Sequence, residues 1–134
     1  MFTAENKEYS IIKFVISDTF SLEELIRLLG LISRVFEIKK PFSFFVHINL
    51  NTMPSPKELL SILKYQVSWM KSNQDNIINI LQSSSIIINS SLVANFLTEI
   101  FKIKPTIKPN LITNDYDEGE KFVTDIMKKL LKKL

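Results

Sequence analysis

The sequence predicts an α/β domain: a single, mostly parallel four-stranded sheet with helices packed on it, in the order β-α-β-α-(α)-β-α-β-α. Short β-branched and aromatic runs alternate along the chain with segments whose apolar residues repeat at helical spacing. The length of 134 residues suits one domain with its own core. Apolar residues make up 46% and charged residues 23%, which is typical of a globular chain.

The first strand–helix unit begins at Ile11. Residues Ile11–Ile16 are β-branched and aromatic, as expected of a strand. Ser21 and Glu24 then have the spacing of a capping box, in which each side chain satisfies a free backbone donor of the other. The helix that they start is predicted to run to about Ile38.

The second unit begins with Phe42–Leu50, which is nearly all apolar and indicates a central strand covered on both faces. Ser55 and Glu58 form a second capping box, and Pro56 occupies the first helical position, where its missing N–H costs nothing. This helix is predicted to continue to about Lys71, with a further short helix at residues 76–82.

The third and fourth units complete the pattern. Residues 85–88 predict a buried strand, and the helix after it begins near Ser90. Residues 110–113 predict the last strand, at the edge of the sheet because prolines 105 and 109 lie beside it. The final helix is predicted over about residues 117–133.

Composition excludes several kinds of chemistry. The chain has no cysteine, which removes disulfides, thiolate metal sites and cysteine nucleophiles. Its two glycines, Gly30 and Gly119, both lie in predicted helices, so no phosphate-binding glycine loop is present. The single histidine, His47, is expected to pack on a sheet face. The abundance of Ile, Lys and Asn is typical of AT-rich genomes, among them those of protists and large viruses.

Charge and hydropathy limit the partners and the location. A net charge of +3 does not indicate nucleic acid, and the lysine-rich end lacks the interleaved aromatic residues of single-strand binders. The acids of residues 115–120 fit helix capping better than a calcium loop, because position 126 is Ile where a bidentate Glu is required. We expect no cofactor, no metal and no transmembrane segment, in a cytoplasmic protein.

The order of elements in the second half of the chain resembles a known family. An Ile-rich strand is followed by a helix that ends in Asn-Phe-Leu-Thr-Glu-Ile-Phe-Lys (95–102), prolines at 105 and 109, an edge strand and Asp-Glu-Gly-Glu-Lys-Phe-Val (117–123). This succession resembles the SpoIIAA-like (STAS-like) fold family, with matching topology over about residues 10–130. The resemblance implies that residues 1–134 are one small domain, non-enzymatic as these domains usually are, that regulates partners or binds lipid-like or nucleotide ligands.

The family's phosphorylation switch is not carried over. In the anti-sigma antagonists of this family, the phosphorylated serine lies in an Asp-Ser-x-Gly loop after a central strand. The matching residues 49–55 contain neither the Asp nor the Gly. Thr52 and Ser55 are therefore positional candidates only, and a helix cap explains Ser55 equally well.

Two helices carry more apolar surface than a helix facing solvent needs. The first helix has only a narrow polar stripe, so that a second subunit could cover its outer side, and packing inside the domain would satisfy the same pattern. The second helix places amphipathic aromatic residues beside its core stripe, as interfaces favour. The candidate interface consists of Leu28, Leu31, Arg34, Val35, Ile62, Tyr65 and Trp69.

Ligands of open α/β sheets bind outside the carboxyl ends of the strands. The loops expected there are rich in hydroxyl and amide groups. The candidate ligand or switch residues are Asp18, Asn51, Thr52, Ser55, Asn89 and Ser90.

The sequence therefore favours a non-catalytic protein-interaction or regulatory domain that forms a homodimer. The alternative is a small-molecule or lipid-binding domain. Enzymatic activity stays open only through Asp18 or Asp115 acting on a bound substrate.

Overall fold

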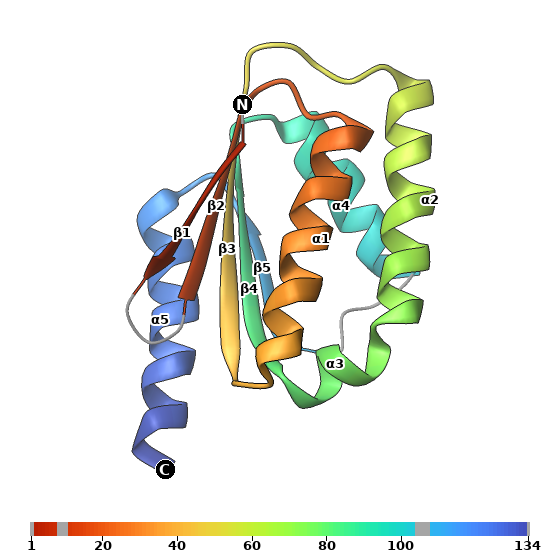
Figure 1. The fold of residues 1–134 in the computed structure, drawn as a ribbon. Coiled ribbons are helices and arrows are strands. Elements are labelled where there is room, and N and C mark those ends of the chain that lie inside the picture. The colour runs from red at the N-terminus through yellow and green to blue at the C-terminus, as the bar shows by residue number, and fades with distance from the viewer. Residues whose placement is uncertain (1, 8–10, 104–107, 134) are drawn as a thin grey trace.

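The computed structural model describes residues 2–7, 11–103 and 108–133, which build a five-stranded sheet between two layers of helices (Figure 1). The strands lie in the order β1-β2-β3-β4-β5. The four strands β2 to β5 are mutually parallel, which confirms the predicted fold class and the predicted order of elements. Their bounds are Ile11–Asp18 (β2), Phe42–Leu50 (β3), Leu81–Ile88 (β4) and Asn110–Thr113 (β5).

One strand was not predicted. β1 (Phe2–Lys7) pairs antiparallel with β2 and forms one edge, so that the whole sheet has five strands instead of four. Its sequence is polar and shows no clear apolar alternation. Backbone pairing with β2 is what makes it a strand, and that pairing leaves no signal in composition.

β4 begins earlier than predicted. The short helix α3 (Gln74–Asn79) ends before residue 82, and β4 starts at Leu81 rather than at Ser85. The added residues include buried serines, which sequence patterning assigns to a loop. Both added hydroxyls have partners inside the fold: Ser83 Oγ lies 2.6 Å from Ser43 Oγ, and Ser84 Oγ donates to Asn110 Oδ1 at 2.6 Å.

The helices are divided unequally between the faces of the sheet. The helices α1 (Leu22–Ile38), α2 (Pro56–Ser72) and α4 (Ser91–Ile103) cover one face, and α5 (Tyr116–Lys133) lies on the other (Figure 1). The parallel strands follow one another in sequence order, and right-handed crossovers between such neighbours place every connecting helix on the same face. α5 follows the last strand and is free to take the opposite face.

Local signals at the helix starts behave as predicted. Ser21 Oγ accepts a hydrogen bond from the Glu24 N–H at 3.2 Å, and Ser55 Oγ accepts one from the Glu58 N–H at 3.1 Å. Asp115 Oδ1 accepts from the Glu118 N–H at 3.2 Å, which gives the acidic stretch before α5 a capping role. β5 lies at an edge, as predicted, although Pro105 lies outside the described residues.

Candidate functional site

A cavity of about 90 Å³ lies between the sheet and helices α1, α2 and α4. Most of its wall is apolar. The central part of the wall is formed by Leu28, Ile32, Val46, Ile48, Trp69 and Leu97. Protein interiors seldom keep voids larger than a water molecule. This cavity is therefore the candidate functional site.

Trp69 holds α2 at the side of the cavity. Its ring stacks on Phe36 of α1 with the centroids 6.1 Å apart, and its Nε1 donates a hydrogen bond to Ser33 Oγ at 3.0 Å. Through these contacts α2 packs against α1 rather than lying on the strands (Figure 1). On this face of β3, Phe44 is half-buried whereas Val46 and Ile48 are each 2% exposed, and the cavity lies between these residues and the helices.

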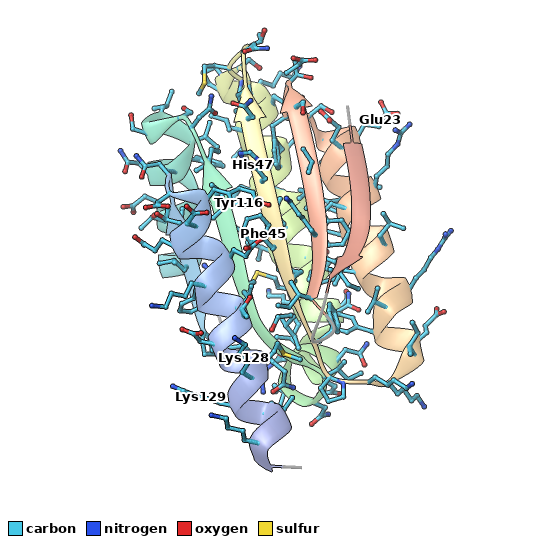
Figure 2. All side chains as sticks on the ribbon, turned by 90° about the vertical axis from the view of Figure 1, so that its left-hand side faces the viewer. Glu23, Phe45, His47, Tyr116, Lys128 and Lys129 are labelled. Atoms are coloured by element: carbon cyan, nitrogen blue, oxygen red, sulfur yellow. The ribbon has the colours of Figure 1, made fainter. Side chains whose placement is uncertain are left out.

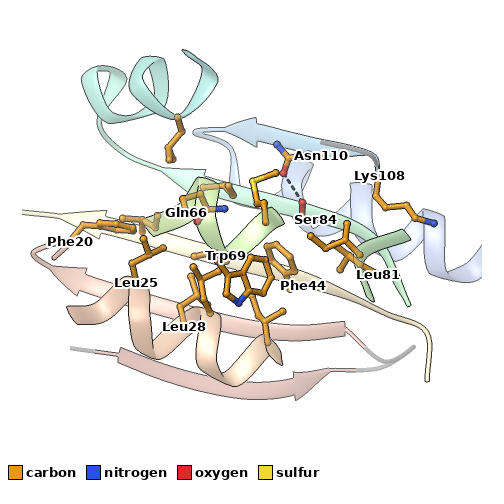
Figure 3. Close-up of a pocket in the computed structure, with 18 of the residues that line it drawn as sticks. Phe20, Leu25, Leu28, Phe44, Gln66, Trp69, Leu81, Ser84, Lys108 and Asn110 are labelled. Atoms are coloured by element: carbon orange, nitrogen blue, oxygen red, sulfur yellow. Dashed lines mark hydrogen bonds between the residues drawn. The ribbon is translucent and has the colours of Figure 1, made fainter. Parts of the chain in front are cut away.

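One end of the cavity is polar. Ser84, Lys108 and Asn110 lie at this end, where β5 begins, whereas Phe20 lies at the other end (Figure 3). Ser84 Oγ donates a hydrogen bond to Asn110 Oδ1 at 2.6 Å. The cavity thus has an apolar body and one end with hydrogen-bonding groups, an arrangement typical of small-molecule sites.

The predicted ligand loops meet at the carboxyl edge of the sheet, where their polar groups bond to one another. Asn51 Nδ2 donates to Asp18 Oδ1 at 2.8 Å, and the Asn51 and Thr52 N–H groups donate to the Asp18 carbonyl at 2.9 and 3.0 Å. Asn89 Oδ1 accepts from the Leu50 N–H at 2.9 Å, and its Nδ2 donates to the Leu50 carbonyl at 3.0 Å. These bonds give the polar residues of three loops a structural role.

The remaining residues of this edge act as helix caps or face solvent. Ser55 caps α2, Ser90 Oγ accepts from the Val93 N–H at 3.3 Å, and Thr52 is exposed. The crevice expected at such an edge arises where the strand order reverses, and β2 to β5 run in sequence order without reversal. A ligand site at these loops stays a prediction, and the cavity lies elsewhere.

The predicted interface is divided by the structure. Leu28 and Ile62 are buried inside the domain, with 6% and 2% of their surface exposed, so they offer no surface to a partner. Trp69 is half-buried against α1. The wide apolar arc of α1 is explained by its position between the sheet and α2, which supply the cover that the sequence pattern requires.

The other predicted interface residues remain accessible. Leu31, Arg34 and Val35 line a groove of about 180 Å³ on the flank of α1 that faces β2, together with Ile38. Ile38 is 62% exposed. Tyr65 lies on α2 with 36% of its surface exposed. This groove is the part of the predicted interface that a partner could reach.

A separate cluster lies on the opposite face, beside the start of α5 (Figure 2). Tyr116 packs edge-on against Phe45 and His47, with ring centroids 5.0 and 5.4 Å apart, and its hydroxyl accepts a hydrogen bond from the Lys13 ammonium. Burial, and then the positive charge of Lys13, lower the pKa of His47 below its ordinary value of 6.5. His47 is therefore neutral at pH 7 and packs on a sheet face.

The part of the chain that the structure describes contains neither a cluster of metal-ligating side chains nor a membrane-spanning helix. No group of three or more His, Asp or Glu side chains is arranged to hold a metal ion. No helix in that part combines the length and the apolar character needed to cross a membrane.

The polar end of the cavity was missed by sequence reasoning. Its side chains come from β4, from β5 and from the segment just before β5, and their approach depends on the tertiary fold: Ser84, Asn110 and Lys108. One signal was available, because a run of serines before an Ile-rich segment indicates a strand with a hydroxyl on each face.

Comparison with known proteins agrees with the fold. No protein-family model and no curated protein matches the sequence. A solved structure from Shewanella loihica PV-4, described as an uncharacterized protein of the DUF3478 family with a SpoIIAA-like fold, is similar with a TM-score of 0.51. The match covers 92% of each chain at 14% sequence identity. The chain has a SpoIIAA-like fold.

Proposed function

We propose that this protein is a non-catalytic binding domain that holds a small, largely apolar ligand between its sheet and helices α1, α2 and α4. The observation that carries the proposal is the cavity of about 90 Å³ described above. The alternative predicted from the sequence, a small-molecule-binding domain, is thereby favoured over the interaction domain, with the site inside the helical layer instead of at the carboxyl-edge loops.

The energy of an empty cavity supports this proposal. At roughly 24 cal/mol per Å³, a void of about 90 Å³ lowers the free energy of unfolding by about 2 kcal/mol. A ligand that fills it restores those contacts. The apolar body of the cavity offers water few hydrogen-bonding partners, which favours a small apolar molecule there.

The side chains of the cavity support a binding role without catalysis. Among the described residues that line it there is no His, Asp or Glu, the groups that usually serve as general acids and bases. Its polar residues are amides, a serine hydroxyl and one lysine. These groups can orient a ligand, and none is paired in the manner of an activated nucleophile.

The test is ligand binding in the cavity. Trp69 is the single tryptophan of the chain and lines the cavity, so its fluorescence reports occupancy directly. We expect octan-1-ol or indole to change this fluorescence and to raise the Tm by roughly 5–10 °C at a hundredfold excess over Kd. The substitution Val46→Phe fills the cavity and should abolish both effects.

Val15→Phe is the matched control for this test. Val15 lies on the opposite face of the sheet, in register with His47, and the added ring is outside the cavity. Binding should persist in this variant. Probe binding that survives Val46→Phe, or that disappears equally in both variants, contradicts the cavity as the site.

The groove on the flank of α1 favours a second candidate function, a homodimer or another protein contact. It brings together Leu31, Arg34 and Val35 with the exposed Ile38. If this surface forms the dimer, Val35→Lys should shift the molecular mass in light scattering from dimer to monomer. The control is Ile78→Lys on α3, at a residue that is 41% exposed and lies outside the groove, and this variant should leave the molecular mass unchanged. A monomer at all micromolar concentrations counts against this function.

A further inference from the structure

We infer that the ligand of the cavity is an amphiphile with an anionic, carboxylate-like head, whose head lies at the polar end beside Lys108 and Asn110. This inference rests on the proposed binding function and adds the chemical class and the orientation of the ligand. It places the head near the start of β5, away from the loops at the carboxyl edge.

The bond between Ser84 and Asn110 determines what the polar end offers. Oδ1 of Asn110 accepts the Ser84 hydroxyl at 2.6 Å, which turns the oxygen toward β4 and leaves the two N–H donors of Nδ2 for a ligand, beside one remaining lone pair of Oδ1. Ser84 itself is 6% exposed and its proton is engaged. This pair therefore presents a donor to the cavity.

The other polar residues add donors and, among the described residues of the wall, one positive charge. The stem of Lys108 lines the cavity, and its ammonium lies at the outer edge of the polar end (Figure 3). An ammonium has three donors and no acceptor. Gln66 and Gln74 supply amides that can adapt to either role. Donors and one positive charge, with no carboxylate in the described wall, match an anionic acceptor and disfavour a cationic one.

The rest of the cavity determines the orientation of such a ligand. From Phe20 and Leu25 to Trp69 the wall is mostly apolar and carries the neutral amide of Gln66 but no positive charge among its described residues, so a carboxylate there would lose its hydration with little compensation (Figure 3). The apolar body of the ligand therefore lies toward Phe20, and the head stays at the end where Lys108 meets solvent. The site selects one orientation by its polarity.

The experiment compares octanoate with octan-1-ol, which have equal chain length and differ in the head, by Trp69 fluorescence and calorimetry at pH 7.5. In the wild-type chain both probes bind. We expect Lys108→Gln to weaken octanoate by about tenfold and to leave octan-1-ol within about twofold. Asn110→Asp keeps the acceptor for Ser84 and replaces the donor with a negative charge, so it should weaken octanoate further and spare octan-1-ol.

The outcomes separate the two proposals. If both probes bind and neither variant changes the octanoate affinity, the inference about the head is wrong and the binding function stands. If neither probe binds the wild-type chain, both proposals fail. Lys129→Gln on α5, a lysine on the other side of the sheet (Figure 2), serves as the charge control and should leave the octanoate affinity unchanged.

Discussion

Helix α5 lies directly against its face of the sheet, whereas α1, α2 and α4 leave a cavity over the other face. Under α5, a methyl group added to Gly119 would lie 2.0 Å from Ile87 Cδ1, which shows how closely the helix approaches β4. On the helical layer opposite, the same strands face a void of about 90 Å³. One sheet thus carries a tightly packed side and a loosely packed side.

Side-chain size on alternate residues of the strands produces this difference. The face under α5 places Ser43, Ser83 and Ser85 beside larger residues such as Phe45 and Ile87, and these small side chains, whose hydroxyls find partners, let the helix come close. The other face contains Phe44, Val46, Ile48 and Ile86, which hold the helices further away. Because successive residues of a strand point to opposite faces, the same segment can pack closely on one face and loosely on the other.

The comparison can be tested at two adjacent serines of β4. Ser85→Val should destabilise the chain by about 3 kcal/mol, because added bulk under α5 combines with loss of the bond to the Gly119 carbonyl. Ser84 points to the cavity, so Ser84→Val loses the bond to Asn110 Oδ1 but adds its methyl groups to empty space, and it should destabilise the chain by about 1 kcal/mol, less than Ser85→Val. Urea denaturation measures both. Equal effects would mean that the faces are packed alike.

The two glycines provide a second test of the packing under α5. Gly119→Ala should cost about 2 kcal/mol, because its methyl group displaces the Ile87 side chain. Gly30 meets no atom within 4 Å of an added Cβ, so Gly30→Ala should stabilise α1 by up to about 1 kcal/mol through helix propensity. Thermal unfolding gives both signs, and a destabilising Gly30→Ala would contradict the open surroundings at that position.

Two buried valines make a third and smaller comparison. Val123 on α5 is fully buried, and Val123→Ile should cost about 1 kcal/mol through overpacking. Val46 borders the cavity, and Val46→Ile should add about 0.5 kcal/mol of stability by filling part of it. The measurement is the free energy of unfolding in urea. A stabilising Val123→Ile would show that the α5 side also has free volume.

The smallest expected effect concerns His47 of β3, which packs against Tyr116 at the start of α5. Since burial and Lys13 lower its pKa in the folded chain, the unfolded chain binds its proton more readily. The stability that neutral His47 confers is fully present above pH 6.5 and is lost as the pH falls through the lowered pKa. NMR titration should give a pKa below 6.5, and His47→Gln should lose less stability than the wild type between pH 7.5 and 5.5.

Much of the fold could be predicted because its signals are local. The capping serines Ser21 and Ser55 start helices where their spacing to Glu24 and Glu58 predicts. The Phe-rich strand β3 has the predicted bounds, whereas the Ile-rich strand β4 ends as predicted but starts four residues earlier, at Leu81 instead of Ser85. β1 was not predicted because its pairing with β2 is a tertiary contact that its polar sequence does not reveal.

The candidate site was much less predictable. The cavity depends on how far α2 stands from the sheet, a distance set by the stacking of Trp69 on Phe36 between two helices. The sequence pattern predicted Trp69 as an interface residue, but it could not distinguish contact with a partner from packing inside the domain. The polar end brings together Ser84 and Asn110, which are 26 residues apart in the chain, and their bond exists only after β4 and β5 pair.

The position of α5 bears on how the chain folds during synthesis. Neighbouring parallel strands are also neighbours in the sequence, so the sheet and its three-helix layer can form progressively as the chain leaves the ribosome. The opposite face of the sheet stays uncovered until residues 116–133 have been synthesised. Its apolar residues are Ile11, Phe45 and Ile87. A chain whose synthesis stops before that point leaves these apolar residues exposed and prone to aggregation. Packing of α5 covers them.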